Sequence, residues 1–210
     1  MTNLFIAYVA AFTLPLLFHS WRVAVLGLAI QGILLSQILT ARLTEHHAWS
    51  PQLVFEFASL FLIRAVFVPW SLFRWMKTHE MTNDFSLISK SLIQWMIAFL
   101  LLVAAFMFGN KMAPSDPHEA LQVGSAAGSI LIGLLVLANQ TNPLGQIVGL
   151  LMLEGGITLV ELLSPHAIPF PVSIGVSLVV VVLVLTCGQF LTRLLAITPG
   201  SDDAEKQVLL

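Results

Sequence analysis

The chain has 210 residues, of which 58% are hydrophobic and only 10% are charged, and its formal net charge is −2. A mean hydropathy of +0.93 lies far above that of a water-soluble domain. Nine Lys and Arg in total provide no basic face of the kind that binds nucleic acid. The single cysteine, Cys187, excludes an internal disulfide. The composition therefore predicts an all-α, polytopic membrane protein embedded in a lipid bilayer.

Apolar runs of membrane-spanning length follow one another along the whole chain. About 20 consecutive apolar residues are needed for a helix to cross the bilayer. We predict seven such helices, at about 3–19, 22–41, 53–75, 87–109, 119–138, 143–163 and 170–195. The first run lacks the positively charged start of a signal peptide and leads directly into the second, so we expect it to be retained.

The basic residues outside these runs predict the orientation, because cytoplasmic loops retain Lys and Arg. If successive loops alternate sides, one side carries only Arg42 and Lys111. The other side carries a larger set: Arg22, Arg74, Lys77, Lys90, Arg193 and Lys206. We therefore expect the amino end outside the cell and the carboxyl end in the cytoplasm.

The third predicted helix contains two charged residues, Glu56 and Arg64. They lie eight residues apart, about 12 Å along a straight helix, so they cannot pair with each other. Arg64 is near the middle of the run and stays protonated, so we expect it to hold a carboxylate or tune its field rather than exchange protons. Pro69 lacks a backbone donor and predicts a kink near Arg64. Glu56 is expected at the outer interface.

Small residues recur at helical spacing in the second half of the chain. Gly124 and Gly128 form one small-x-x-x-small pair, and Gly145 and Gly149 form another. Such glycines let helix backbones approach closely. The short link at residues 139–142 predicts that the fifth and sixth helices form an antiparallel hairpin.

Glu154 lies in the middle of the otherwise apolar run 143–163. A carboxylate at that depth is costly unless it is paired, protonated or facing a polar cavity. Desolvation favours a neutral carboxyl group that can carry a proton, whereas a pairing with Arg64 would favour the ionised group. The sequence leaves these two states open, and a structural pair that never exchanges its proton is the alternative to a proton site.

The residues around Glu154 extend this hypothesis. Glu161 follows seven residues later and returns to nearly the same face, about 10 Å along the axis. It either extends a polar track from Glu154 or simply reaches water at the interface. Gly155 and Gly156 follow the acid directly. They predict either a local helix irregularity that admits water or a close helix contact.

Histidine and cysteine spacing does not indicate a metal centre. His46 and His47 are adjacent, so they point in different directions, and the sequence shows no third ligand nearby. No nucleophile and base can be placed together by their spacing. We therefore predict neither a metal site nor a catalytic site.

Three stretches of the chain resemble the hydrogenase-4 component E membrane subunits of formate-hydrogenlyase-type respiratory hydrogenases. The first is Ser-Trp-Arg at 20–22, leading into a helix with Gln31, and the second is Arg64 followed by Val-Pro at 68–69. The third and most specific lies at 146–157, where QIVGL is followed by EGGI. It is similar to the family's Gln-x-x-Gly motif, with an acid five residues after the glycine and then Asn-Gly.

This resemblance implies a fold, a location and a set of partners. The last three helices would be similar to the smallest antiporter-like subunit of respiratory complex I. The implied parts are a four-helix extension at 1–110, the complex-I-like unit at 119–195 and a cytoplasmic tail at 196–210. The chain would belong to a proton- or sodium-coupled complex in a bacterial or archaeal inner membrane. Its neighbours would be large antiporter-like subunits and a peripheral redox module, so the chain itself would bind no cofactor.

The chain departs from the family's pattern at several positions. Arg64 replaces the family's usual lysine, and Gly155 replaces the Asn after the acid. Ser173 and Val179 occupy the frame where relatives carry acids on the last helix. A relay needs successive titratable groups or ordered water. Three functions therefore remain: an ion-coupled subunit with Glu154 as the proton site, a structural scaffold, or a stand-alone small-solute transporter, which lacks the expected internal repeat.

Overall fold

The computed structural model describes residues 2–18, 20–46, 51–78, 87, 91–164 and 170–197. All regular secondary structure in these ranges is helical, which confirms the all-α prediction. The elements are α1 (Thr2–Leu17), α2 (Trp21–His46), α3 (Pro51–Ser59), η1 (Leu60–Phe67), α4 (Val68–Thr78), α5 (Leu92–Met112), α6 (Pro117–Asn139), α7 (Pro143–Leu163) and α8 (Phe170–Ile197).

Several of these helices have the length and the surface of membrane helices. Five stretches of the described chain are long and apolar enough to cross a bilayer: Trp21–Ala41, Val54–Lys77, Leu92–Met112, Pro117–Asn139 and Pro143–Leu163. The apolar helix α1 and the searched part of α8, Ile174–Phe190, are shorter. Large apolar side chains cover the outer faces, as at Phe99, which is 70% exposed. Such a surface is suited to lipid rather than water, and the chain is a membrane protein.

Helix ends follow local capping rules more closely than hydropathy. Helix α6 begins at Pro117 because the Asp116 side chain accepts a hydrogen bond from the His118 N–H. Helix α5 begins five residues later than predicted, at Leu92, after the extended backbone of Ser91. Helix α2 runs past its predicted end to His46. His47 and most of the predicted tail, residues 198–210, lie outside the described residues.

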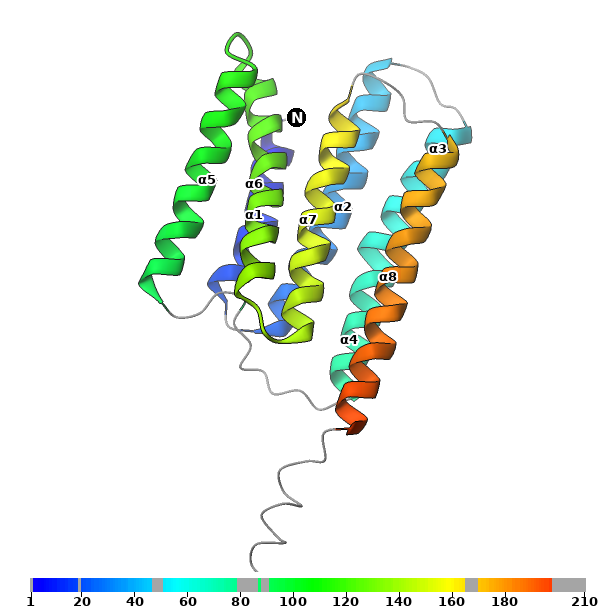
Figure 1. Cartoon of the computed structure of the whole chain (residues 1–210). Helices are drawn as coiled ribbons and strands as arrows, with labels where there is room; N and C mark the ends of the chain where they lie inside the picture. Colours follow the sequence, from blue (N-terminus) through cyan, green and yellow to red (C-terminus); the bar gives the residue numbers. More distant parts are fainter. Residues whose placement is uncertain are drawn as a thin grey trace, which may run out of the picture.

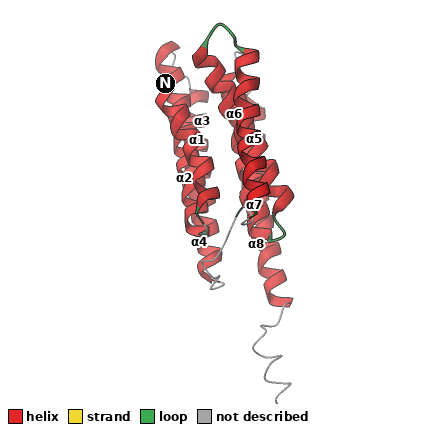
Figure 2. Ribbon diagram, turned by 90° about the vertical axis from the view of Figure 1, so that its left-hand side faces the viewer, coloured by secondary structure: helices red, strands yellow, loops and turns green. Residues whose placement is uncertain are grey.

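The helices form two layers (Figures 1 and 2). One layer contains α5, α6, α7 and α8, and the other contains α1, α2 and the continuous rod α3–η1–α4. Across the interface α1 packs against α6, α2 against α7, and α4 against α8. The fully buried side chains that fill this interface include Tyr8, Phe12, Leu35 and Met152. The residues that meet at mid-depth therefore come from α2, η1 and α7.

Close backbone approach joins α6 to α7. A Cβ atom added to Gly133 would lie 2.6 Å from the Leu153 backbone nitrogen and 2.9 Å from the Gly149 carbonyl oxygen. Gly149 in turn faces the backbone of Leu137, and a Cβ atom added to Gly149 would lie 3.0 Å from the Leu137 nitrogen. Only glycine leaves room for this spacing. Gly133 was not singled out by its sequence spacing, although it lies at the tightest part of the hairpin's backbone contact.

The four glycines predicted to lie at helix contacts have different neighbours. Gly124 faces the Phe106 ring of α5, and Gly128 faces Phe12 of α1. Gly149 faces α6, whereas Gly145 faces the Gln140 side chain in the turn before α7. One spacing motif thus serves several different contacts.

The rod α3–η1–α4 contains a widened π-helical segment, η1, around Arg64. The Val68 N–H donates to the Ile63 carbonyl oxygen, five residues earlier. Pro69 follows directly, and in an α-helix its ring would clash with the carbonyl group four residues earlier, that of Ala65. A wider turn relieves this clash. The irregularity predicted near Arg64 is therefore a change of helix type.

Helix α7, by contrast, stays α-helical through Gly155 and Gly156. Of the two alternatives predicted for these residues, the structure has the close helix contact and not the local irregularity. A Cβ atom on Gly155 would lie 2.5 Å from the Gln31 side-chain nitrogen, and one on Gly156 would lie 2.9 Å from the Ile130 backbone nitrogen. Water-admitting backbone is not needed to explain either residue.

We expect Gly133→Ala to lower the free energy of unfolding by about 1–3 kcal/mol, because an added methyl group forces α6 away from α7. Thermal unfolding of the purified full chain in detergent measures this. Gly175→Ala on α8 is the matched control, since a Cβ atom there meets nothing within 4 Å. Equal effects of the two substitutions would contradict the proposed packing.

Candidate functional site

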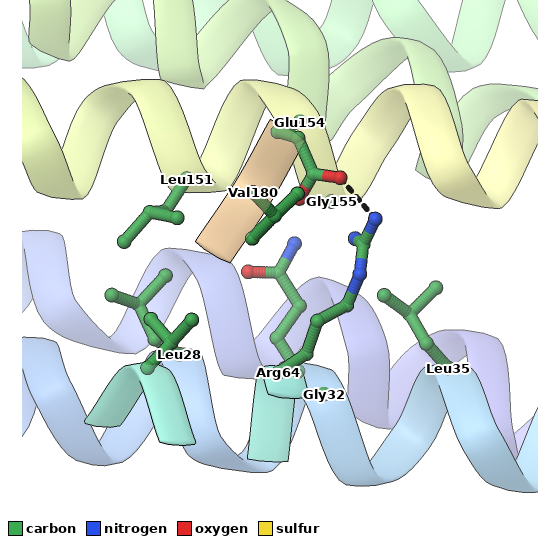
Figure 3. A pocket seen from close by; sticks show the side chains of 10 residues that line it. Leu28, Gly32, Leu35, Arg64, Leu151, Glu154, Gly155 and Val180 are labelled. Carbon is green, nitrogen blue, oxygen red and sulfur yellow. Dashed lines mark hydrogen bonds and ion pairs between the residues drawn. The ribbon is translucent and has the colours of Figure 1, made fainter. Parts of the chain in front are cut away.

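Arg64 and Glu154 form an ion pair between η1 and α7 (Figure 3). The guanidinium Nη2 of Arg64 donates a hydrogen bond to Oε1 of Glu154. The side chains are only 11% and 19% exposed, respectively. One turn further along α7, the Thr158 hydroxyl donates to the Glu154 backbone carbonyl at 3.1 Å and to Oε1 at 3.3 Å. The carboxylate is thus held by one charged and one neutral donor.

Two glycines allow these polar groups to meet. A Cβ atom on Gly32 of α2 would lie 2.7 Å from the Ala65 nitrogen, so η1 approaches α2 along its bare backbone. Gly155 likewise lets the side chain of Gln31 lie against the backbone of α7, beside Glu154. Gly32 was missed at the sequence level because its partner lies on another helix and no short spacing motif marks it.

Two small cavities border the ion pair. The first encloses about 20 Å³ and is lined by Gln31, Arg64 and Glu154 together with apolar residues (Figure 3). The second encloses about 50 Å³ and is lined by Arg64, Glu56 and Glu161. Since a water needs about 10–15 Å³, both cavities have room for water. Arg64 lies between them and reaches both.

The three predicted acids and Arg64 line these cavities. We define the polar track as Glu56, Arg64, Glu154 and Glu161 together with the two cavities. Glu161 does not contact Glu154 directly but shares the second cavity with Arg64. Glu56 lines that cavity too, from α3. The track leads from mid-bundle toward the end where α7 finishes, the upper end in Figure 1.

The polar track has no charged continuation toward the lower end, where α7 begins. There the wall of the first cavity is formed by Leu28, Leu151 and Val180. Helix α8 contains no carboxylate. Val179 is 63% exposed and does not line either cavity, and the side chain of Ser173 lies outside the described residues. Within the described part of the chain, the charged groups of the track therefore continue from Glu154 in one direction only.

A second polar group lies beside the ion pair in the layer interface. Gln31 Nε2 donates to the Tyr8 hydroxyl at 2.7 Å and to Ser129 Oγ at 3.2 Å. Ser129 donates in turn to the Met152 carbonyl oxygen at 2.9 Å. These contacts join α1, α2, α6 and α7 through three buried side chains. Tyr8, the only tyrosine of the chain, and Ser129 were missed, although a lone polar residue in an apolar run is a usable signal.

Among the described residues, no group of three or more His, Cys, Asp and Glu side chains is placed to hold a metal ion. No protein-family model, curated protein or solved structure matches the chain. The ion pair and its cavities are therefore the features from which a function can be argued.

We expect Glu154→Gln to destabilise the chain more than Arg64→Gln. Removing one partner of a buried pair costs about 3–5 kcal/mol when the other charge is left uncompensated. Glu154 can take up a proton when Arg64 is removed, but Arg64 cannot lose one. Thermal unfolding of both variants in detergent compares the two losses. Equal losses would show that Arg64 can pair instead with an acid of the second cavity.

Proposed function

We propose that the chain is a non-catalytic subunit of an ion-translocating membrane complex, related to hydrogenase-4 component E, and that Glu154 is its proton site. The observation that carries this proposal is a carboxylate at mid-helix that lines one cavity and is paired with an arginine that lines this cavity and a second one, both with room for water. A purely packing residue at that depth would not need cavities on both sides of its partner.

The pair supports proton exchange because two opposing effects act on Glu154. Burial favours the neutral acid, and the neighbouring Arg64 favours the carboxylate. A proton that reaches Glu154 removes the attraction that holds Arg64. The freed guanidinium already lines the second cavity, where Glu161 and Glu56 compensate its charge only in part, without the direct contact that Glu154 makes. Arrival of a proton at Glu154 is thereby coupled to movement of the positive charge of Arg64 along the polar track. In this proposal Arg64 tunes Glu154, and Glu161 extends the path.

The topology proposed with this function has seven crossing helices, with α1 and α8 added to the five long apolar stretches. The lower end carries the exposed bases Arg22, Arg74, Lys77 and Arg193. Basic residues remain on the cytoplasmic side. The amino end would lie outside and the carboxyl end in the cytoplasm of a bacterial or archaeal inner membrane, with the polar track open to the outside.

The partners would be large antiporter-like subunits and a peripheral redox module that holds all cofactors. Two features support a multisubunit setting. Helix α5 packs against α6 and leaves most of its surface uncovered, with Phe99, Leu100 and Met107 each at least 66% exposed. The polar track ends at Glu154, so ions that reach it must leave through a neighbouring subunit.

A structural scaffold is the second candidate, and a specific observation favours it. Glu154 already has both a charged and a neutral hydrogen-bond donor, so the pair is satisfied without any exchange. The absence of a carboxylate on α8 is in agreement with this role. The two functions differ in what happens when both charges are removed together.

The double variant Arg64→Gln/Glu154→Gln separates the two functions, because it leaves no uncompensated charge. We expect the complex to assemble but to lose proton translocation. Acidification of inverted membrane vesicles during turnover, measured per electron transferred, gives the coupling, and native gel electrophoresis gives the assembly. Glu119→Gln, which removes an exposed acid at the upper end, is the control and should couple normally.

Normal coupling in the double variant would refute the proton-site proposal and establish the scaffold. Recovery of the tagged wild-type chain alone, with no bound subunits, would instead favour an independent transporter.

A further inference from the structure

An apolar groove opens between α7 and α8 at the lower end of the molecule, away from the polar track. It encloses about 450 Å³, and its walls include Ile147, Leu150 and Phe190. Helix α8 makes only small contacts with both α4 and α7, and the groove lies beside its contact with α7. Phe190 is 58% exposed at its edge. In a membrane protein this surface adjoins lipid acyl chains.

Basic side chains lie where the groove reaches the lower end. Arg193 is exposed and follows Phe190 by three residues, which places the two on one face of α8. Lys77 is exposed at the end of α4, the helix that packs against α8. Neither base forms an ion pair with a described residue. A negatively charged group at the mouth of the groove would meet these positive charges.

The described side chains at the two ends of the molecule differ in charge. Among the described side chains, the lower end carries Arg22, Arg74, Lys77 and Arg193 and no acid. The upper end carries Asp116, Glu119, Glu161, Glu56 and one base, Lys111. Anionic lipid headgroups are attracted to such clusters of Lys and Arg at the membrane surface.

The groove is mostly apolar and open along one side, so an apolar chain can lie in it without being enclosed. A lipid acyl chain is narrow enough to enter. The polar side chains Gln146 and Thr186 also line the groove, and they suit the polar linkage between an acyl chain and its headgroup.

We propose that this groove binds one anionic phospholipid, with an acyl chain between α7 and α8 and the phosphate beside Arg193. This site goes beyond the ion-coupling role and does not depend on it. The bound lipid would fill the space between α7 and α8 and so fasten α8, the least tightly packed end of the layer, to the bundle.

Photo-crosslinking of the full chain in nanodiscs tests this site. The discs contain equal phosphatidylglycerol and phosphatidylcholine, with a trace of either lipid carrying a diazirine on its acyl chain. Peptide mass spectrometry locates the adducts. We expect labelling on α7 and α8 around Ile147 and Phe190, several-fold stronger with the anionic probe than with the neutral one. The exposed face of α5 should label weakly and equally with both.

The variants test charge and shape separately. Arg193→Gln should abolish the preference for the anionic probe, and Lys111→Gln, at the opposite end, should leave it unchanged. Leu150→Trp should reduce groove labelling with both probes, and its helicity and thermal stability are measured beside it. Equal labelling by both probes in the wild type, or an unchanged preference in Arg193→Gln, would overturn the proposal. So would adducts to another protein chain at this groove in native membranes.

Discussion

The ion pair between Arg64 and Glu154 is the interaction on which the arrangement at mid-depth depends. Neither charge is stable alone in an apolar bundle, and Arg64 cannot discharge by losing a proton. The two layers must therefore meet so that η1 and α7 face each other across α2. Bare backbone at Gly32 and Gly155 makes that approach sterically possible. The positions of three helices thus follow from the need to keep one buried cation beside one buried anion.

The buried hydrogen bonds of Gln31, Tyr8 and Ser129 fix the remaining helices around this pair. An amide or hydroxyl in an apolar interior is costly unless it is bonded, so this group holds α1 and α6 in register with α2 and α7. Gln31 also lines the cavity beside Glu154. Packing and the proposed function therefore share residues here, and a change in Gln31 would alter both the fit of the layers and the surroundings of the acid.

The helical fold was largely predictable from residue composition, because apolar runs of about 20 residues have few alternatives in a bilayer. The runs predicted at 119–138 and 143–163 agree with α6 and α7 to within two residues at each end. The site was predictable only as separate parts. Glu154 and Arg64 were conspicuous as charges, but 90 residues separate them, and no spacing rule brings them into contact. The role of Gly155 was ambiguous for the same reason, since its neighbour Gln31 lies on another helix.

The asymmetry of the polar track limits the proposed ion-coupling function. Glu154 lines the first cavity, and Arg64 joins it to the second, which Glu56 and Glu161 line toward the upper end, whereas Leu28, Leu151 and Val180 line the other side. A carboxylate reached from one direction can bind and release a proton but cannot by itself pass it across a membrane. Transfer across the full thickness then requires a group supplied by another chain. A missing acid on α8 is thus compatible with ion coupling, provided that the exit lies at a subunit contact rather than within this bundle.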